Sequence, residues 1–174
     1  MVLATVIVLA CLAAADWYVR NAELRGLVTA AEAAAEAVDG WETARDRILS
    51  DLPGEFYRTP EQRRDSDRQL RREAAAATMS LTDAAAGVRD VRATLPWHRQ
   101  VERARDRHLD HIEAWLARLR RVARDPSTLS EPIADITATR SVSEQAFRAA
   151  LPPVALSGLD DRVAALFDQQ PAAN

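Results

Sequence analysis

The chain has very little cysteine and few residues that interrupt a helix. Its 174 residues include one cysteine and five glycines, and aromatic residues occupy only 5% of positions. The single Cys11 lies in an apolar run near the N-terminus, so the rest of the chain has no thiol with which to form a disulfide. Few glycines and aromatics together with abundant alanine are typical of an all-α protein.

The sequence also lacks the common motifs of catalytic and phosphate-binding sites. It contains no glycine-rich phosphate loop, no paired-cysteine metal motif and no G-x-S-x-G nucleophile motif. We therefore expect no enzyme activity, no cofactor and no bound metal ion.

Lysine is missing altogether, and all 23 basic residues are arginines. Arginine and alanine codons are GC-rich whereas lysine codons are not, so we expect a GC-rich genome and a bacterial source. The arginines are intermixed with 26 acidic residues, and the net formal charge is −3. Without a broad cationic surface, nucleic acid is not an expected partner.

The N-terminal stretch is apolar enough to span a membrane. Val2–Val19 has about 18 residues, and only Thr5 and Asp16 among them are polar or charged apart from the interfacial aromatics. A spanning helix needs about 20 residues, within a range of about 17 to 25. Trp17 and Tyr18 follow where an aromatic belt would lie, and Arg20 comes next. We predict a transmembrane anchor over residues 1–19 that contacts membrane lipid.

Other interpretations of this stretch stay open. The small residues Ala13–Ala15 resemble a signal-peptide cleavage site, and the residues before Cys11 loosely resemble a lipoprotein box. Both alternatives normally require a basic segment ahead of the apolar run, and only Met1 precedes it here. The stretch could also be an apolar helix buried in a soluble core or an oligomer. Whether Met1 is the true start is open as well.

After Arg20 the pattern becomes periodic. Apolar residues recur alternately three and four positions apart as far as Pro53–Gly54, which should end the helix. This spacing predicts one long helix with a buried seam, interrupted by arginine at only two positions. The predicted seam comprises Trp17, Arg20, Leu24, Leu27, Ala31, Ala34, Val38, Trp41, Arg45, Ile48 and Leu52.

A second long helix should begin at Thr59-Pro60-Glu61-Gln62. Thr59 can cap it, Pro60 suits its first position, and Gln62 completes a capping box. Its seam is the most regular in the chain, and two long helices joined by a short Pro/Gly connection predict an antiparallel hairpin. That seam comprises Leu70, Ala74, Ala77, Leu81, Ala84, Val88, Val91 and Leu95.

Pro96 marks a change of phase. The next seam starts at Trp97 rather than continuing through His98, which favours a tight turn over a kinked continuous helix. If the helices are antiparallel, Trp97 returns beside Trp17 at the membrane-side end. We expect His98 to be a turn or interface residue. The third seam comprises Trp97, Val101, Ala104, His108, Ile112, Trp115, Leu119 and Val122.

Two further helices complete the predicted fold. The third helix should end near Arg124, and a fourth should start near Ser130 and stop at Pro152–Pro153. The inner side of the fourth helix should carry Ile133, Ile136, Arg140, Ser143, Phe147 and Leu151, flanked by Ala146 and Ala150. A short fifth helix should then bury Leu159, Val163, Leu166 and Phe167.

His108 and His111 are the strongest candidates for chemistry, although weak as metal ligands. Both should point inward, and inward histidines with glutamates form metal sites in helix bundles. However, Arg105 rather than a glutamate lies three residues before His108, and the other long seams offer no inward carboxylate. Two seam histidines hydrogen-bonded to their neighbours are the favoured interpretation, with metal binding or pH sensing as the alternative.

The arginines have ordinary explanations as well. Arg20, Arg45 and Arg140 interrupt apolar seams, where each is expected to pair with a carboxylate or to extend toward water rather than to line a polar cleft. Basic residues in the last turns of the third helix suit its dipole. Contact with phosphate or an anionic lipid is the alternative for that group, which comprises Arg118, Arg120, Arg121 and Arg124.

Taken together, the patterns predict an elongated antiparallel four-helix bundle with a short fifth helix. The bundle should occupy residues 20–168, after the anchor at 1–19 and before a polar tail at 169–174. Sensory domains of bacterial receptors have similar shapes, which is an analogy of fold alone. We expect a single-pass, extracytoplasmic interaction module that binds a protein partner or a second copy of itself. The alternative is a bundle that senses a ligand or metal through inward histidines and arginines.

Overall fold

The computed structural model describes residues 2–50, 59–156 and 158–168, and within these ranges the chain is helical and has no strand. The predicted all-α bundle is confirmed. Its elements in chain order are α1 (Val2–Ser50), α2 (Pro60–Asp90), α3 (Arg99–Arg124), the 3-10 helix η2 (Pro126–Ser130), α4 (Ala134–Ala150) and α5 (Leu159–Asp168). The predicted polar tail at 169–174 and the seam residue Leu52 lie outside the described residues.

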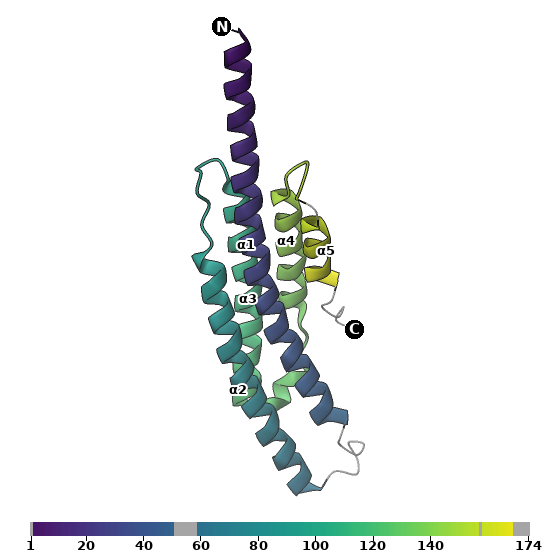
Figure 1. The fold of residues 1–174 in the computed structure, drawn as a ribbon. Coiled ribbons are helices and arrows are strands. Elements are labelled where there is room, and N and C mark those ends of the chain that lie inside the picture. Colours follow the sequence, from purple (N-terminus) through teal and green to yellow (C-terminus); the bar gives the residue numbers. More distant parts are fainter. Residues whose placement is uncertain (1, 51–58, 157, 169–174) are drawn as a thin grey trace.

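The long helix α1 is continuous over 49 residues. Its first turns project beyond the other helices, and the remainder packs in the bundle (Figure 1). We call the side of the projection the near end of the bundle and the side of Ser50 its far end. Every predicted seam residue from Leu24 to Trp41 is buried, whereas Arg45 and Ile48 are partly exposed. The alternating spacing of three and four residues therefore identified the buried face of α1.

The start of α2 matches its sequence signature, but its end does not. The Thr59 hydroxyl accepts a hydrogen bond from Gln62 N, and the Gln62 side chain accepts one from Thr59 N, which completes the capping box. The helix stops at Asp90, five residues before the predicted end at Leu95. Val91 is already extended, so the chain unwinds before Pro96. Ala85 rather than Ala84 takes the buried position.

The tight turn predicted at Pro96 is confirmed. Residues 91–98 connect α2 to α3, and His98 N donates to the Leu95 carbonyl within the turn. The sequence predicts Trp97 as the first buried residue of the α3 seam. This prediction is wrong, because Trp97 is 64% exposed and His98 is buried instead. The other predicted seam residues of α3 are all buried: Val101, Ala104, His108, Ile112, Trp115, Leu119 and Val122.

The fourth helix begins later than predicted. Glu131 is extended, as expected for a residue that precedes a proline, and α4 starts only at Ala134. Ser130, the predicted start of this helix, is instead the last residue of the 3-10 helix η2. Ile136, Ser143, Phe147 and Ala150 are buried, and the four predicted apolar residues of α5 are buried as well.

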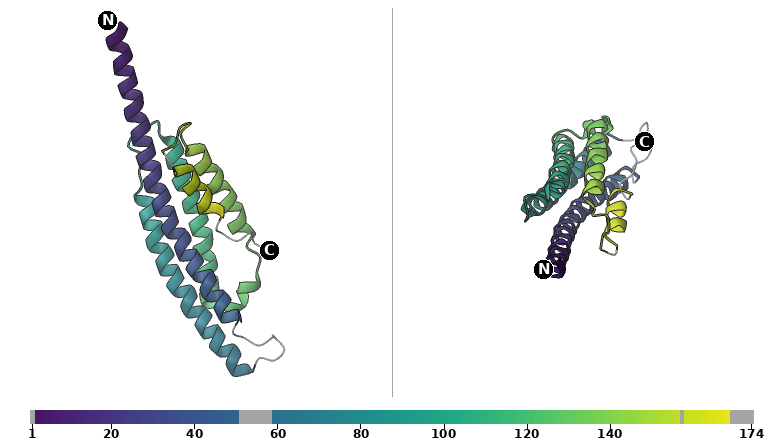
Figure 2. Two further views of the ribbon diagram at one scale, coloured as in Figure 1. Left: turned by 45° about the vertical axis from the view of Figure 1, so that its right-hand side comes forward. Right: turned by 90° about the horizontal axis from the view of Figure 1, so that it is seen from above.

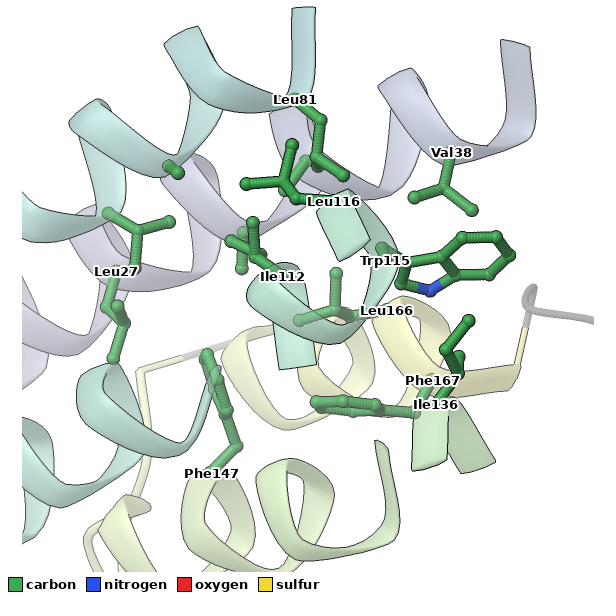
Figure 3. Close-up of a cluster of buried hydrophobic side chains, with 14 of the residues drawn as sticks. Leu27, Val38, Leu81, Ile112, Trp115, Leu116, Ile136, Phe147, Leu166 and Phe167 are labelled. Atoms are coloured by element: carbon green, nitrogen blue, oxygen red, sulfur yellow. The ribbon is translucent and has the colours of Figure 1, made fainter. Parts of the chain in front are cut away.

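The helices do not form a closed square. α1, α2 and α3 pack on one another, and α4 packs on α3. The short α5 packs against both α1 and α4 (Figure 2). Side chains from these helices meet in one core, in which Phe147 of α4 and Phe167 of α5 lie edge to face with ring centroids 5.6 Å apart (Figure 3).

Among the described residues, α1 is the one helix long and apolar enough to cross a membrane. Its N-terminal side chains are exposed, with Val6, Ile7 and Val8 each more than half accessible. The stretch from Val2 to Val19 measures about 27 Å at 1.5 Å per residue, close to the roughly 30 Å of a bilayer's hydrocarbon core. The bundle core therefore leaves this apolar surface uncovered.

Candidate functional site

The near end of the bundle contains a buried histidine held between two carboxylates. His98 is 3% exposed, and its Nδ1 lies 2.7 Å from Glu23 Oε2. Its Nε2 lies 3.1 Å from Asp16 Oδ1. Each ring nitrogen lies within hydrogen-bonding distance of a carboxylate, so both polar edges of the imidazole are engaged. His98 is thus a residue of the turn interface, as the sequence predicts.

Trp97 reaches the same carboxylate as its neighbour. Its indole Nε1 donates to Asp16 Oδ1 over 2.5 Å, while Thr94 N donates to Glu23 Oε1. Asp16, the residue before Trp17, therefore binds Trp97, and the two tryptophans lie at the same end of the bundle, as predicted. The turn between α2 and α3 is fixed to α1 by four polar contacts.

Polar side chains of α1 also hold the connection between α4 and α5. Arg20 donates through Nε and Nη2 to the Ala150 carbonyl, at 3.2 and 2.9 Å, which satisfies the C-terminus of α4. Trp17 Nε1 donates to the Val154 carbonyl at 2.6 Å. Asn21 is fully buried, and its Oδ1 accepts from Leu156 N at 2.9 Å. We refer to Asp16, Trp17, Arg20, Asn21 and Glu23 with their partners as the near-end clasp.

The two inward histidines lie side by side on α3 and bond to hydroxyl groups of α4. His108 Nδ1 is 3.1 Å from Ser143 Oγ, and His111 Nδ1 is 3.1 Å from Thr139 Oγ1. The two ring centroids are 6.1 Å apart. Burial lowers the pKa of His108 to about 3, and the nearby His111 acts in the same direction. His108 is therefore neutral at physiological pH.

The surroundings of these histidines do not resemble a metal centre. Across the described residues, no group of three or more histidine, cysteine, aspartate or glutamate side chains could hold a metal ion. Phe147 lies edge to face with His108, with ring centroids 5.5 Å apart. The contacts to Ser143 and Thr139 agree with seam histidines bonded to their neighbours, and the absence of a metal stays a prediction.

The three seam arginines are paired in different ways. Arg45 lies 2.8 Å from Asp46 and 3.6 Å from Glu42, which is the carboxylate pairing that the sequence suggests. Arg20 and Arg140 instead donate to main-chain carbonyls near the ends of α4 and α5, at Ala150 and Phe167. Such bonds satisfy carbonyls that a helix leaves free in its last turn.

An open cleft lies at the far end, between α1, α3 and α4. It has a volume of about 1060 Å³ and includes Arg45 in its wall. Trp115 and Arg118 of α3 also line it, and they are 6% and 4% exposed. From the sequence, Arg118 is expected to suit the C-terminal dipole of its helix, with contact to phosphate or an anionic lipid as the alternative, whereas the structure buries its side chain.

Sequence reasoning did not identify the near-end clasp as a unit. Arg20, Trp17 and Trp97 stood out individually, but Asn21 and Glu23 fall between seam positions and carry no pattern of their own. Their partners lie 71 to 135 residues away in the chain. Only the packing of the helices could bring them together.

No protein-family model, curated protein or solved structure matches the chain.

Proposed function

We propose that the protein is a membrane-anchored interaction module, with α1 as the anchor and the helical bundle held outside the cytoplasm. The observation that carries the proposal is the exposed apolar start of α1, continuous with a bundle that has its own core. A large exposed apolar surface needs a membrane or a protein to cover it. Its length suits a bilayer.

The near-end clasp supports this arrangement. It lies at the point where α1 leaves the bundle and includes Trp17 and Trp97, residues of the kind that favour a membrane interface. Because the clasp binds α1 to the α2–α3 connection and to the α4–α5 connection, the anchor would set the orientation of the whole bundle. A rigidly oriented bundle is suited to presenting its sides to a protein partner or to a second copy.

The extracytoplasmic location is part of the proposal. Beyond Cys11 the sequence has no thiol, which suits an oxidising compartment. Sidedness can be tested with a single reporter thiol, by placing Ala75→Cys, an exposed position of α2, in a Cys11→Ala background. A membrane-impermeant maleimide added to intact cells should label it. Labelling only after lysis would contradict the proposed sidedness.

Anchoring can be tested by carbonate extraction of membranes. The full chain should remain in the membrane pellet, whereas a variant lacking residues 2–15 should be released. Because that variant keeps the clasp and the core, its circular dichroism should show an intact bundle. Release of the full chain by carbonate would overturn the anchor.

The interaction role can be tested by photo-crosslinking in intact membranes. A photoreactive residue at exposed positions of α2, such as Ala75, should give one discrete adduct of defined mass, either a dimer or a heteromeric complex. A diffuse pattern that is the same at every exposed position would argue against a specific partner.

A further inference from the structure

The cleft at the far end is lined by residues of α1, α3, α4 and the segment that precedes α4. Nearer the middle of α4, Arg140 donates a hydrogen bond to the Phe167 carbonyl of α5. One turn earlier on α4, Thr137 and Ala138 line the cleft, which has a volume of about 1060 Å³.

The α3 side of the cleft carries two buried donors one helical turn apart. Trp115 Nε1 and Arg118 Nη1 are enclosed and have no hydrogen-bond acceptor among the residues that the structure describes. The other terminal nitrogen of Arg118 donates to the Leu129 carbonyl. Glu131 Oε2 lies 3.6 Å from Arg118 Nη1, which is an ion pair longer than a hydrogen bond. Buried donors without acceptors are rare in folded proteins and are stabilised when an acceptor reaches them.

On the α3 side of the cleft, two arginines share a single carboxylate. Glu131 is shared by Arg118 and Arg121, at 3.6 and 3.8 Å. Burial lowers the pKa of Arg118, and the neighbouring Arg121 adds to this effect while Glu131 opposes it. Across the cleft, Arg45 is engaged by Asp46 and Glu42.

The remaining lining is largely apolar. Trp41 and Leu49 of α1 face the cleft from one side, and Leu129 and Ile133 face it from the other. The indole nitrogen of Trp115 lies on the edge of its ring turned away from Val38 of α1 (Figure 3). An apolar enclosure with a small number of placed polar groups is the usual form of a small-molecule site.

We propose that this cleft binds a small organic monocarboxylate with an apolar body. The carboxylate accepts hydrogen bonds from Trp115 Nε1 and Arg118 Nη1, and the apolar body lies against Trp41 and the aliphatic lining. A single negative charge matches the one positive charge by which Arg118 and Arg121 exceed Glu131 on the α3 side, whereas the lining as a whole carries three carboxylates and two arginines. A multiply charged phosphate would instead face the carboxylates of Glu42, Asp46 and Glu131, which also line the cleft.

The test uses the full chain in detergent micelles with hydrocinnamate as the probe. Titration followed by the indole N–H signals in nuclear magnetic resonance should shift the Trp115 signal, which is assigned by its loss in Trp115→Phe. Hydrocinnamide has the same apolar body without the charge and should shift it at concentrations at least about tenfold higher. Equal binding of the acid and the amide would overturn the proposal, because it would show partition into apolar surface or micelle alone.

Two variants test whether each donor contributes to binding, independently of the stability of the fold. Arg118→Gln and Trp115→Phe should each weaken hydrocinnamate binding by about tenfold or more, since each removes one donor to a carboxylate. In Trp115→Phe, binding is followed by the indole N–H signal of Trp41, which also lines the cleft. Arg107→Gln, an exposed arginine of the same helix, is the matched control and should bind as the parent chain does. Trp115→Phe keeps an aromatic ring in the core, so it remains informative if Arg118→Gln unfolds the bundle.

Unchanged affinity in Trp115→Phe, or no shift of the Trp115 signal up to millimolar probe, would refute the site. Either result would leave membrane anchoring untouched. The cleft is lined by far-end residues such as Trp41, Leu49 and Trp115, whereas the apolar start of α1 projects at the near end (Figure 1).

Discussion

His98 Nδ1 lies 2.7 Å from Glu23 Oε2, a contact between residues separated by 75 positions in the chain. Both side chains are almost fully buried, at 2% and 7% exposure. This pair fixes the turn between α2 and α3 to the point where α1 leaves the bundle. Its removal is the most direct test of whether the clasp holds the near end together.

The variant His98→Ala should lower the free energy of unfolding by about 2 kcal/mol, because it leaves the buried Glu23 carboxylate without its hydrogen-bond partner on the histidine ring. Denaturant unfolding followed by circular dichroism measures this loss. Arg99→Ala, at the exposed neighbouring position, is the control and should change stability by less than about 0.5 kcal/mol. Similar stability of both variants would show that the clasp contributes little.

Acid should destabilise the bundle through His108. Its pKa is about 3 in the folded chain and 6.5 for the unperturbed side chain, so the unfolded state binds the proton more tightly. The stabilisation is therefore complete above pH 6.5 and is lost as the pH falls from 6.5 toward 3, at up to about 1.4 kcal/mol per pH unit.

His108→Leu removes this titrating group and should flatten the acid limb of the stability curve. Between pH 7 and pH 5 the parent chain should lose about 2 kcal/mol more than the variant does. Urea unfolding at fixed pH values gives both curves. Parallel curves would mean that His108 is protonated in the folded chain or accessible to water.

Packing rather than ion pairing should hold α5 in place. Phe167→Ala removes a ring that is 2% exposed and should cost about 3 kcal/mol or more. Arg162 forms two short contacts with Glu32 of α1, but these side chains are 37% and 39% exposed, so Arg162→Ala should cost at most about 1 kcal/mol. Hydrogen exchange of α5 amides would show which variant releases the helix. A larger effect of Arg162→Ala would reverse this ranking.

Metal removal should leave the protein unchanged. His108 and His111 bond to Ser143 and Thr139, and no third ligand of a metal site accompanies them among the described side chains. Dialysis against a chelator and titration with Zn²⁺ should both leave the melting temperature within error. A rise in the melting temperature with Zn²⁺ that disappears in a His108→Ala, His111→Ala variant would establish a metal site instead.

Much of the fold follows from local features of the sequence. The spacing of apolar residues fixed the buried faces of α1 and α3, since a helical face repeats every three to four residues whatever it packs against. The Thr59–Gln62 capping box set the start of α2, because its two hydrogen bonds lie within one turn. The errors fell near Pro96 and Pro132. α2 ends at Asp90, before its apolar pattern does, and α4 starts only at Ala134, because Glu131 before Pro132 is extended.

The apolar start of α1 and the five-helix pattern were therefore determined by the sequence alone, because composition and periodicity act over a few turns. The pairing of His98 with Glu23, the place of α5 between α1 and α4, and the unpartnered donors of Trp115 and Arg118 were decided only by tertiary structure. These features depend on which helices become neighbours, which the periodicity within a single helix does not specify.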